Sequence, residues 1–339
     1  ARQAAPGSNA TTADTTPYGA WVQLEQPRLG TQVTVANDEI FAPKERLIDP
    51  NEPVYIEGKY DEHGKWMDGW ESRRKRGPGN DYCIIRLGIP AVLHGIDIDT
   101  SYFTGNYPSE ASIDACVSDD DVPAGGWQEI LAKTPLQGDS HHFLDIDDGS
   151  AWTHVRLNIY PDGGVARLRL YGEVTPDFAT VAGTIDLVAV ENGGRAIACS
   201  DEHFGSMRNL NVAGRGENMS DGWETARRRG PGNDWVILSL GHAGTIEKVE
   251  IDTVHFKGNY PDRASLEAAV FDSDADAVHD SDAWQVLLPE SKLEMDKQHF
   301  FDAELNDIGP VSHVRMSIYP DGGVSRLRLY GRIEPGTSK

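Results

Sequence analysis

Residues 68–82 read DGWESRRKRGPGNDY and residues 221–235 read DGWETARRRGPGNDW, so that 11 of 15 positions are identical. A second pair of segments repeats even more closely. Residues 158–172 read NIYPDGGVARLRLYG and residues 317–331 read SIYPDGGVSRLRLYG, with 13 of 15 positions identical. Repetition on this scale indicates that the chain contains two copies of one unit.

Shorter matches occur in the same order in both copies. They pair Asp38–Phe41 with Asp201–Phe204, Ile98–Thr100 with Ile251–Thr253, and Gly105–Pro108 with Gly258–Pro261. The offset between the copies changes from 163 to 153 and then to 159, so the loops differ in length within a shared framework. We therefore expect two domains of about 150 residues each, over residues 18–175 and 176–339, preceded by a disordered extension over residues 1–17.

Short segments of period-two hydrophobicity predict β-strands in each copy. Val155, Leu157 and Ile159 alternate with polar residues, as do Leu168 and Leu170. The chain also has 35 Gly and 19 Pro to form turns, and no long segment keeps a 3.6-residue period. This pattern predicts an all-β protein made of two tandem jelly-roll β-sandwich domains.

Composition excludes several classes of function. No stretch approaches the ~18 consecutive apolar residues of a membrane-spanning helix, so we expect no membrane partner. The chain has 31 basic and 54 acidic residues, and its net charge of −23 repels nucleic acid and anionic lipid. An anionic substrate is still allowed, because a pocket can be locally positive within an acidic protein.

The cysteines indicate a reducing environment. There are three of them, Cys83, Cys116 and Cys199, without the CxxC spacing of a thiolate zinc site. Cys83 falls in an apolar run, which predicts a buried and unreactive thiol. We therefore expect a cytoplasmic protein.

The repeated Arg-Leu-Arg places arginines on the face of a strand that points away from the core. If this strand forms a hairpin with the preceding one, these arginines lie beside Arg156 and Arg315. Such a cluster could bind a carboxylate bidentately, or it could consist of solvated surface side chains. The Tyr-Pro-Asp-Gly-Gly before it is typical of a turn. The residues concerned are Arg167 and Arg169 in the first copy and Arg326 and Arg328 in the second.

The repeated Asp-Gly-Trp-Glu loop combines carboxylates, an indole and arginines. This composition suits a site for a small polar anion, although a loop held together by its own salt bridges would have the same residues.

Two histidines distinguish the second copy from the first. His255 occupies the position of Tyr102, and His203 occupies the position of Ile40. Imidazoles can transfer protons near neutral pH, so the copies are not chemically equivalent. A metal site of His203, Asp252 and His255 is conceivable but lacks diagnostic spacing. No HExxH, GxSxG, P-loop or dinucleotide-binding motif supports the corresponding enzyme classes.

Together, these doubled motifs and the segment Ser200–Ser206 resemble the allantoicase family. The likeness extends from about Gly30 to Gly331. It implies two galactose-binding-like jelly-roll domains, a homo-oligomer, and a hydrolase of C–N bonds in linear amidines. Such enzymes convert allantoate and water to ureidoglycolate and urea in purine catabolism.

Allantoate is a small carboxylate whose central carbon carries two ureido groups, and the residues of the second copy suit it. We expect Arg227 or Arg326 to bind the carboxylate. Glu224 and Asp252 would bind ureido groups or activate water, and His255, together with His203, would transfer protons. The predicted substrate-binding set also includes Asp221, Trp223 and Asn259.

The corresponding residues of the first copy could form a second or degenerate site, or contribute across a domain interface. They are Glu71, Arg74, Asp99 and Arg167. The sequence requires no cofactor, and a divalent metal is possible but unsupported. The alternative function is a non-enzymatic tandem jelly-roll protein that binds carbohydrate or another small ligand.

Overall fold

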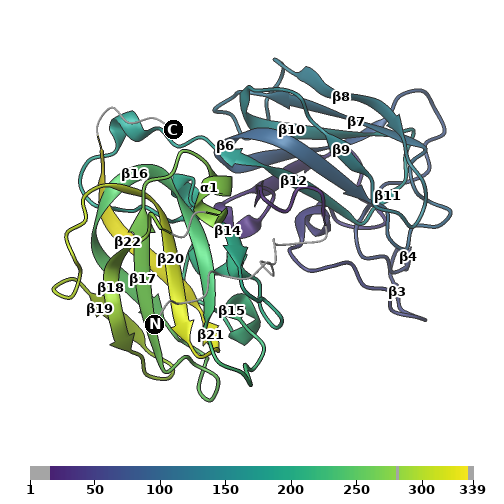
Figure 1. Ribbon diagram of the computed structural model, residues 1–339. Helices are drawn as coiled ribbons and strands as arrows, with labels where there is room; N and C mark the ends of the chain where they lie inside the picture. Colours follow the sequence, from purple (N-terminus) through teal and green to yellow (C-terminus); the bar gives the residue numbers. More distant parts are fainter. Residues whose placement is uncertain (1–15, 280–281, 335–339) are drawn as a thin grey trace. The chain divides into compact units, whose positions relative to one another are not determined.

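A computed structural model describes residues 16–279 and 282–334, which form two compact units (Figure 1). The N-terminal unit spans Trp21–Thr175, and the C-terminal unit contains the chain from Pro176 onward together with the described residues before Trp21. The predicted extension over residues 1–17 lies outside the described residues except for Thr16 and Pro17.

The N-terminal unit is a β-sandwich whose two layers share one long strand, β6 (Asp81–Asp99). Residues 81–86 of β6 pair mainly with β10 and β2, whereas residues 91–99 pair with β12 and β9. The remaining strands extend these layers at their edges. The strands are β1 (Val22–Gln23), β2 (Gln32–Ala36), β7 (Glu110–Cys116), β8 (Gln128–Pro135), β9 (Phe143–Asp145), β10 (Ala151–Tyr160) and β12 (Arg167–Val174).

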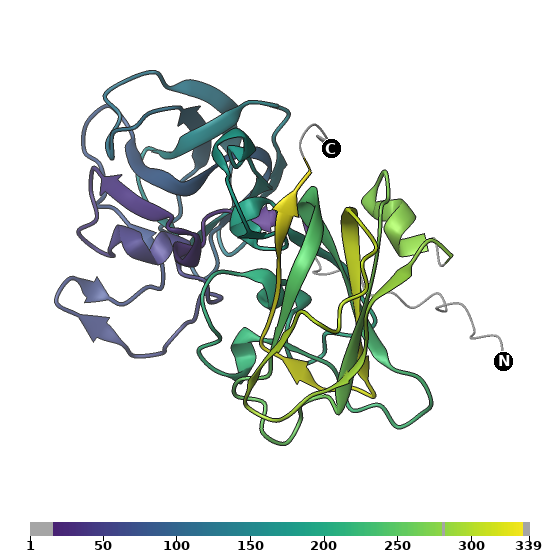
Figure 2. The same cartoon turned by 90° about the vertical axis from the view of Figure 1, so that its left-hand side faces the viewer.

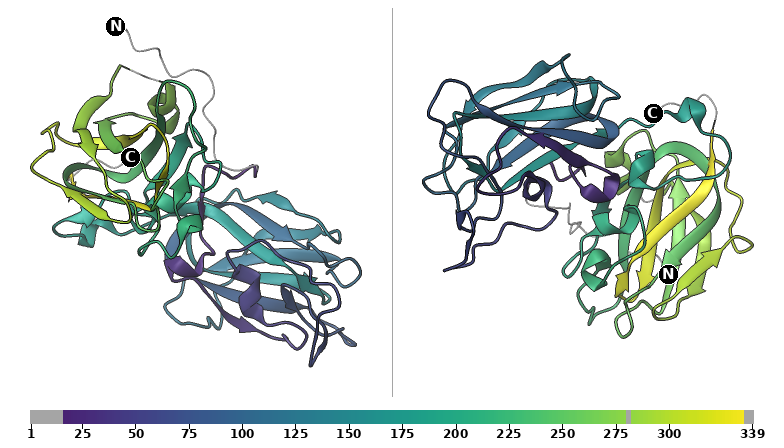
Figure 3. Two further views of the ribbon diagram at one scale, coloured as in Figure 1. Left: turned by 90° about the horizontal axis from the view of Figure 1, so that it is seen from below. Right: turned by 180° about the vertical axis from the view of Figure 1, so that it is seen from behind.

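The C-terminal unit repeats this topology around β16 (Asp234–Asp252), as Figures 2 and 3 show from other directions. The first part of β16 pairs with β20 and β14, and the second part pairs with β22 and β19. The elements are β13 (Ile185–Asp186), β14 (Arg195–Cys199), β17 (Arg263–Ala269), α1 (Asp274–His279), β18 (Gln285–Lys292), β19 (Gln298–Phe301), β20 (Val311–Tyr319) and β22 (Arg326–Ile333).

Short elements decorate both sandwiches. Two-residue strand pairs join β5 (Trp70–Glu71) to β11 (Gly164–Val165), β15 (Trp223–Glu224) to β21 (Gly323–Val324), and β3 (Tyr60–Asp61) to β4 (Gly64–Lys65). Single turns of 3-10 helix occur at Pro27–Leu29, Lys44–Ile48, Phe178–Thr180, Val190–Asn192, Met207–Asn211 and Met219–Asp221. Within residues 16–279 and 282–334, no helix combines the length and apolar character needed to cross a membrane.

Each sandwich encloses its own apolar core, and the predicted alternation is confirmed. Val155, Leu157 and Ile159 of β10 are fully buried, and so are Leu168 and Leu170 of β12. Burial of these side chains supplies the main stabilisation, at about 25 cal/mol per Å² of apolar surface removed from water. The two jelly rolls therefore follow directly from the strand patterns.

The two arginine-bearing strands do not form a hairpin, so the condition for placing Arg167 and Arg326 beside Arg156 and Arg315 is not met. β10 pairs with β6 and β7, whereas β12 pairs with β6 and β1. Arg156 instead forms an ion pair of 2.6 Å with Asp114 of β7, and Arg315 pairs with Glu267. The long strand β6 separates β10 from β12, because the chain crosses from one layer of the sandwich to the other between them.

The Tyr-Pro-Asp-Gly-Gly turn joins two repeated motifs. Gly163 and Gly322 have φ angles of 135° and 133°, which favour glycine. The Asp162 carboxylate accepts the backbone N–H of Lys75 at 2.6 Å, and Asp321 accepts that of Arg228 at 2.8 Å. This turn therefore fixes the arginine-rich loop in both units.

The predicted state of the cysteines agrees with the structure. Cys83, Cys116 and Cys199 are all buried thiols. Burial raises the pKa of the Cys83 thiol well above its ordinary value and also raises that of Cys199. Both groups therefore stay protonated and unreactive near neutral pH.

Candidate functional site

Strand β16 carries two carboxylates on its outer face where it ends. Asp252 lies opposite Arg326 of β22 and Gln298 of β19, and Glu250 lies opposite Arg328. Alternate residues of a strand share a face, so both carboxylates point away from the core, and cross-strand neighbours lie beside them.

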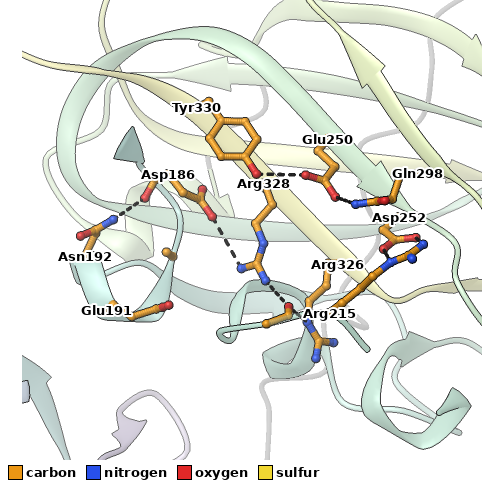
Figure 4. A pocket seen from close by; sticks show the side chains of 12 residues that line it. Asp186, Glu191, Asn192, Arg215, Glu250, Asp252, Gln298, Arg326, Arg328 and Tyr330 are labelled. Atoms are coloured by element: carbon orange, nitrogen blue, oxygen red, sulfur yellow. Dashed lines mark hydrogen bonds and ion pairs between the residues drawn. The ribbon is translucent and has the colours of Figure 1, made fainter. Parts of the chain in front are cut away.

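A pocket of about 400 Å³ lies over this face of the C-terminal unit (Figure 4). Its other walls come from Asp186 of β13, from Glu191 and Asn192 of the 3-10 helix Val190–Asn192, and from Arg215 of a loop. Carboxylates, guanidinium groups and amides therefore line one cavity. It offers both donors and acceptors to a small polar ligand.

Arg215 and Asp252 form an ion pair at one side of the pocket. Arg215 Nε donates to Asp252 Oδ2 at 2.8 Å, and the carboxylate is fully buried while the arginine side chain is 51% exposed. The backbone N–H of Val254 also donates to Asp252, at 2.9 Å. The hydrogen bond from Arg215 to Asp252 raises the pKa of that guanidinium, which carries a permanent charge.

Glu250 is the centre of a second network in the pocket. The Tyr330 hydroxyl donates to Glu250 Oε2 at 3.0 Å, and Gln298 Nε2 donates to Oε1 at 2.7 Å. Burial, together with the hydrogen bond to Glu250, raises the pKa of Tyr330 to about 12. The phenol is therefore neutral at physiological pH and acts as a donor.

Arg328 is held by the loop that covers it. Its Nη2 donates to the carbonyls of Val212 and Gly214, both at 2.6 Å, and its Nη1 lies 3.6 Å from Asp186 Oδ2. Asp186 also accepts the backbone N–H of Leu329 at 2.9 Å. Burial raises the pKa of the Asp186 carboxyl above its ordinary value.

Arg326 also lines the pocket, but its contacts are those of a structural residue. The side chain donates to the carbonyls of Gly214, Asp221 and Ser325, and its Nη2 pairs with Asp221 Oδ2 at 2.7 Å. Only 2% of it is exposed. Arg326, which was expected to be either a ligand or solvated, therefore instead connects its strand to the loop from a buried position.

The same ties recur in the N-terminal unit. Arg167 donates to the carbonyls of Asn51, Asp68 and Ala166 and pairs with Asp68 Oδ2 at 2.9 Å. The doubled Asp-Gly-Trp and Arg-Leu-Arg motifs therefore bind each other in both copies. Their repetition reflects a shared architecture.

The other predicted residues of the Asp-Gly-Trp-Glu loop do not line the pocket. Trp223 is fully buried in the core and donates its indole N–H to the Asp201 carbonyl at 2.8 Å, so its predicted substrate contact finds no support in this geometry. Glu224 accepts a hydrogen bond from Asn259. Glu71 accepts one from Asn106 at 2.7 Å, and burial raises the pKa of Glu71.

The two predicted histidines contact different parts of the C-terminal unit. His255 has a φ of 71° and contacts the Gly216 carbonyl through Nε2 at 2.9 Å, beside the loop that bears Arg215. Tyr102 has almost the same φ, 68°, so this backbone conformation belongs to both units. His203 is exposed and packs against Phe204.

Arg74 and Arg227 are exposed on their loops and do not line the pocket. Of the predicted set, the structure thus brings Asp252 and Arg326 into the pocket, with His255 next to it. Asp99 and Arg167 lie at the equivalent places in the N-terminal unit. Among the described residues, no three His, Cys, Asp or Glu side chains are arranged to hold a metal ion.

Sequence reasoning missed Glu250, Tyr330 and Arg215 in the pocket, whereas Arg328 had been named as an arginine that could bind a carboxylate. Glu250 and Tyr330 could have been found, because Glu250 lies two residues from Asp252 and Tyr330 two residues from Arg328, on the same face of a strand. Arg215 lies outside the repeated motifs and gave no signal.

The fold and the pocket define a tandem β-sandwich protein with a polar site for a small ligand. The "Allantoicase repeat" family matches residues 22–175 and 185–334. Two bacterial relatives are a "Probable allantoicase 1" of Burkholderia mallei (strain ATCC 23344), 55% identical and covering 93% of this chain and 95% of the relative, and a "Probable allantoicase" of Pseudomonas aeruginosa (strain LESB58), 54% identical, covering 94% and 98%.

A solved structure supports the same assignment. The crystal structure of allantoicase from Saccharomyces cerevisiae aligns with a TM-score of 0.79 at 38% identity, over 92% of this chain and 93% of that chain. The chain belongs to the allantoicase family.

Proposed function

We propose that this chain hydrolyses allantoate to ureidoglycolate and urea, and that the pocket of the C-terminal unit is a site of this reaction. Family membership favours the enzyme over the non-enzymatic binding protein. The lining of the pocket supports this location of the active site, because arginines, carboxylates and amides surround a space of about 400 Å³.

Arg215 binds the carboxylate of the substrate in this proposal. Its guanidinium is half exposed while remaining anchored to Asp252, so it can present donors to a second carboxylate. Arg328, on the same face, adds positive charge. The amides of Gln298 and Asn192 and the Glu250 carboxylate then bind ureido N–H and C=O groups.

Glu250 and Tyr330 supply the proton transfers. Water attacks the central carbon, and its proton passes to Glu250. The C–N bond to one ureido group breaks with its electron pair on nitrogen, which takes the Tyr330 proton and leaves as urea. Glu250 returns a proton to Tyr330 along their hydrogen bond, so one water is consumed for each urea released.

This assignment revises the roles expected from the sequence. Asp252 anchors Arg215, and Arg326 supports the pocket wall through Asp221. His255 positions the Arg215 loop through the Gly216 carbonyl. Glu224, with Asn259, supports the neighbouring loop.

Three further properties are part of the proposal. The reaction needs no metal, since acid–base groups of the chain carry each proton. The protein is a homo-oligomer, as the family resemblance implies, which sedimentation analysis would test. It works in the cytoplasm, a location supported by three buried thiols.

The test is urea release from allantoate by the purified protein, before and after exhaustive chelation. Rapid release unaffected by chelation is the expected result. Release that is lost on chelation and restored by a divalent ion would overturn the metal-free mechanism. No release under either condition would overturn the enzyme and leave a binding protein.

A further inference from the structure

The N-terminal unit presents a corresponding set of carboxylates and arginines. Asp97 and Asp99 lie at the end of β6, opposite Arg169 and Arg167 of β12. Asp97 and Asp99 are 3% and 1% exposed. This is the arrangement described above for the end of β16, in the other copy of the fold.

Structural landmarks align the two units residue by residue. His142 Nδ1 contacts the Ile98 carbonyl at 2.7 Å, and His299 Nδ1 contacts the Ile251 carbonyl at 3.0 Å. Each of these histidines also accepts, at Nε2, a backbone N–H five residues earlier, at 2.8 Å in both units. The preceding residues are therefore equivalent: His141 in the N-terminal unit and Gln298 in the C-terminal unit.

Two further positions differ between the units. By strand register, Asp97 takes the place of Glu250, one methylene shorter. Glu52 takes the place of Arg215. Arg167 Nε donates to the carbonyl of the residue before Glu52, and Arg326 Nε donates to the carbonyl of the residue before Arg215. The shorter carboxylate leaves space for an imidazole where the other unit has a glutamine.

His141 and Asp97 form a dyad. His141 Nδ1 lies 2.7 Å from Asp97 Oδ2, and Nε2 lies 4.0 Å from Asp99 Oδ1. The imidazole side chain is 45% exposed, and its ring stacks against Phe143 with centroids 5.7 Å apart. A buried carboxylate that holds one ring nitrogen orients the imidazole and leaves the other nitrogen for proton transfer.

We propose that the N-terminal unit carries a second active site for small ureido carboxylates, in which His141 is the general acid and Asp99 the general base. The proposal rests on the function proposed above. Each unit then has its own active site, with Tyr330 as the proton donor in the C-terminal unit and His141 as the proton donor in the N-terminal unit.

The step balances in atoms and electrons. Water bonds to the central carbon of allantoate, and its proton passes to Asp99. The C–N bond breaks with its electron pair on nitrogen, which takes the proton of His141 Nε2 and leaves as urea. The proton on Asp99 is then released to solvent and His141 takes one back from solvent, to which its 45% exposed side chain has access, so one water is consumed for each urea.

The charges around His141 favour its protonated form. Burial opposes the charge, but the hydrogen bond to Asp97 and the carboxylates of Asp97, Asp99 and Glu52 together raise the pKa of His141 above its ordinary value. The positive charges on this face are Arg167 and Arg169, each bound to loop carbonyls. Turnover in this unit should therefore fall as the pH rises through the titration of His141.

The experiment measures urea release from allantoate between pH 5.5 and 9 for the full chain. It compares the wild type with Glu250→Gln, which disables the C-terminal site, and with the double variant Glu250→Gln, His141→Gln. Glutamine is the residue that the C-terminal unit has at this position. The matched control adds His63→Gln, a half-exposed histidine elsewhere in the N-terminal unit, to Glu250→Gln.

We expect Glu250→Gln to retain a turnover that declines as an imidazole deprotonates. Adding His141→Gln should lower that turnover about 100-fold, the usual scale for the loss of a general acid, while His63→Gln leaves it unchanged. Thermal melts would establish that each variant is folded.

Equal turnover with and without His141→Gln would overturn the proposal. So would a Glu250→Gln variant that is already as inactive as the double variant at every pH. A wild-type protein that releases no urea would instead overturn the proposed function itself. The two failures are therefore distinguishable.

Discussion

The two units share their buried ties and differ at their outer sheet faces. Arg167 with Asp68 and Arg326 with Asp221 make the same set of hydrogen bonds, and all belong to the repeated motifs. On the outer face, Glu250 becomes Asp97, while Gln298 and Arg215 become His141 and Glu52.

This contrast distinguishes the positions that maintain the fold of a duplicated chain from those that determine the chemistry of each site. A buried arginine with several carbonyl acceptors tolerates no change, because each lost donor leaves a buried acceptor unsatisfied. Glu250 and Asp97 are also buried, but they bind fewer backbone groups than these arginines do, and their positions can diverge. The positions that differ between the copies therefore give the two sites different chemistry, while the positions that are identical maintain the fold.

The largest expected effect concerns the shared framework. Arg326→Met and Arg167→Met should each reduce the free energy of unfolding by about 3–5 kcal/mol, because each leaves a carboxylate and several carbonyls without their donor. Denaturant titration would measure both. The exposed arginines Arg229 and Arg76 provide matched controls, whose replacement by Met should change stability by about 0.5 kcal/mol or less. Unequal losses for the two buried arginines would refute the equivalence of the frameworks.

The next effect concerns the proton transfers of the C-terminal unit. In a chain whose N-terminal site is disabled by His141→Gln, Glu250→Gln should lower kcat for urea release about 100-fold, since a neutral amide cannot accept a proton. In the same background, Glu247→Gln replaces an exposed glutamate that pairs with Arg332 and should leave kcat unchanged. A kcat that survives Glu250→Gln in this background would remove Glu250 from the mechanism.

A smaller effect concerns Arg215, whose position is occupied by Glu52 in the N-terminal unit. In the His141→Gln background, Arg215→Met should raise KM for allantoate about 10–100-fold, the range for losing hydrogen bonds to a charged group. Because Arg215→Met also leaves the fully buried Asp252 carboxylate without its cationic partner, the melting temperature should fall as well, so KM is measured at a temperature at which the variant is folded. Steady-state kinetics would measure the effect, with Arg332→Met as the control at an arginine that is 69% exposed. An unchanged KM would place the substrate carboxylate elsewhere.

The smallest effect concerns two buried carboxyls, one in each unit, that make the same kind of hydrogen bond to the backbone. Glu25 and Asp186 each accept the backbone N–H of a leucine and lie beside an arginine, and burial raises the pKa of both. The folded state therefore holds these protons more tightly than the unfolded state. Stability should fall as the pH rises from the ordinary pKa of each group through its raised, folded value.

Glu25→Gln removes this dependence in the N-terminal unit, and its amide oxygen can still accept the Leu170 N–H. Denaturant titrations at several pH values between 4 and 7 would measure the slope of stability against pH. We expect a shallower decline for Glu25→Gln than for the wild type, with the exposed Glu62→Gln as a neutral control. Parallel curves for Glu25→Gln and the wild type would contradict the assignment.

Much of the fold followed from local pattern. The alternation around Val155 and Leu168 predicted the strands and their buried faces, because a strand that covers a core must place every second side chain inside. What local pattern left open was whether residues 151–160 and 167–174 pair as a hairpin, and they do not. Adjacent strands in the sequence need not be adjacent in a sandwich, and the pairing depended on β6, a strand far earlier in the chain.

The candidate site was predicted less well. Asp252 was found because it lies in a repeated motif, and its neighbour Glu250 was missed although it shares the same face. His141 was missed because it lies in none of the repeated motifs and its partner Asp97 is 44 residues away. Arg227 and Arg74 were chosen for their motif, yet they are exposed and lie away from the pocket.

The sequence by itself determined the duplication, the all-β class and the family, because these depend on periodicity and repeated motifs that are written along the chain. Only the tertiary structure decided which charged side chains are buried ties and which line a site. A charge is assigned to one role or the other by its partners across strands and loops. Arg326 finds Asp221 105 residues away, and His141 finds Asp97 44 residues away. Such partners are set by the crossing of β6 and β16 between layers, which no local pattern specifies.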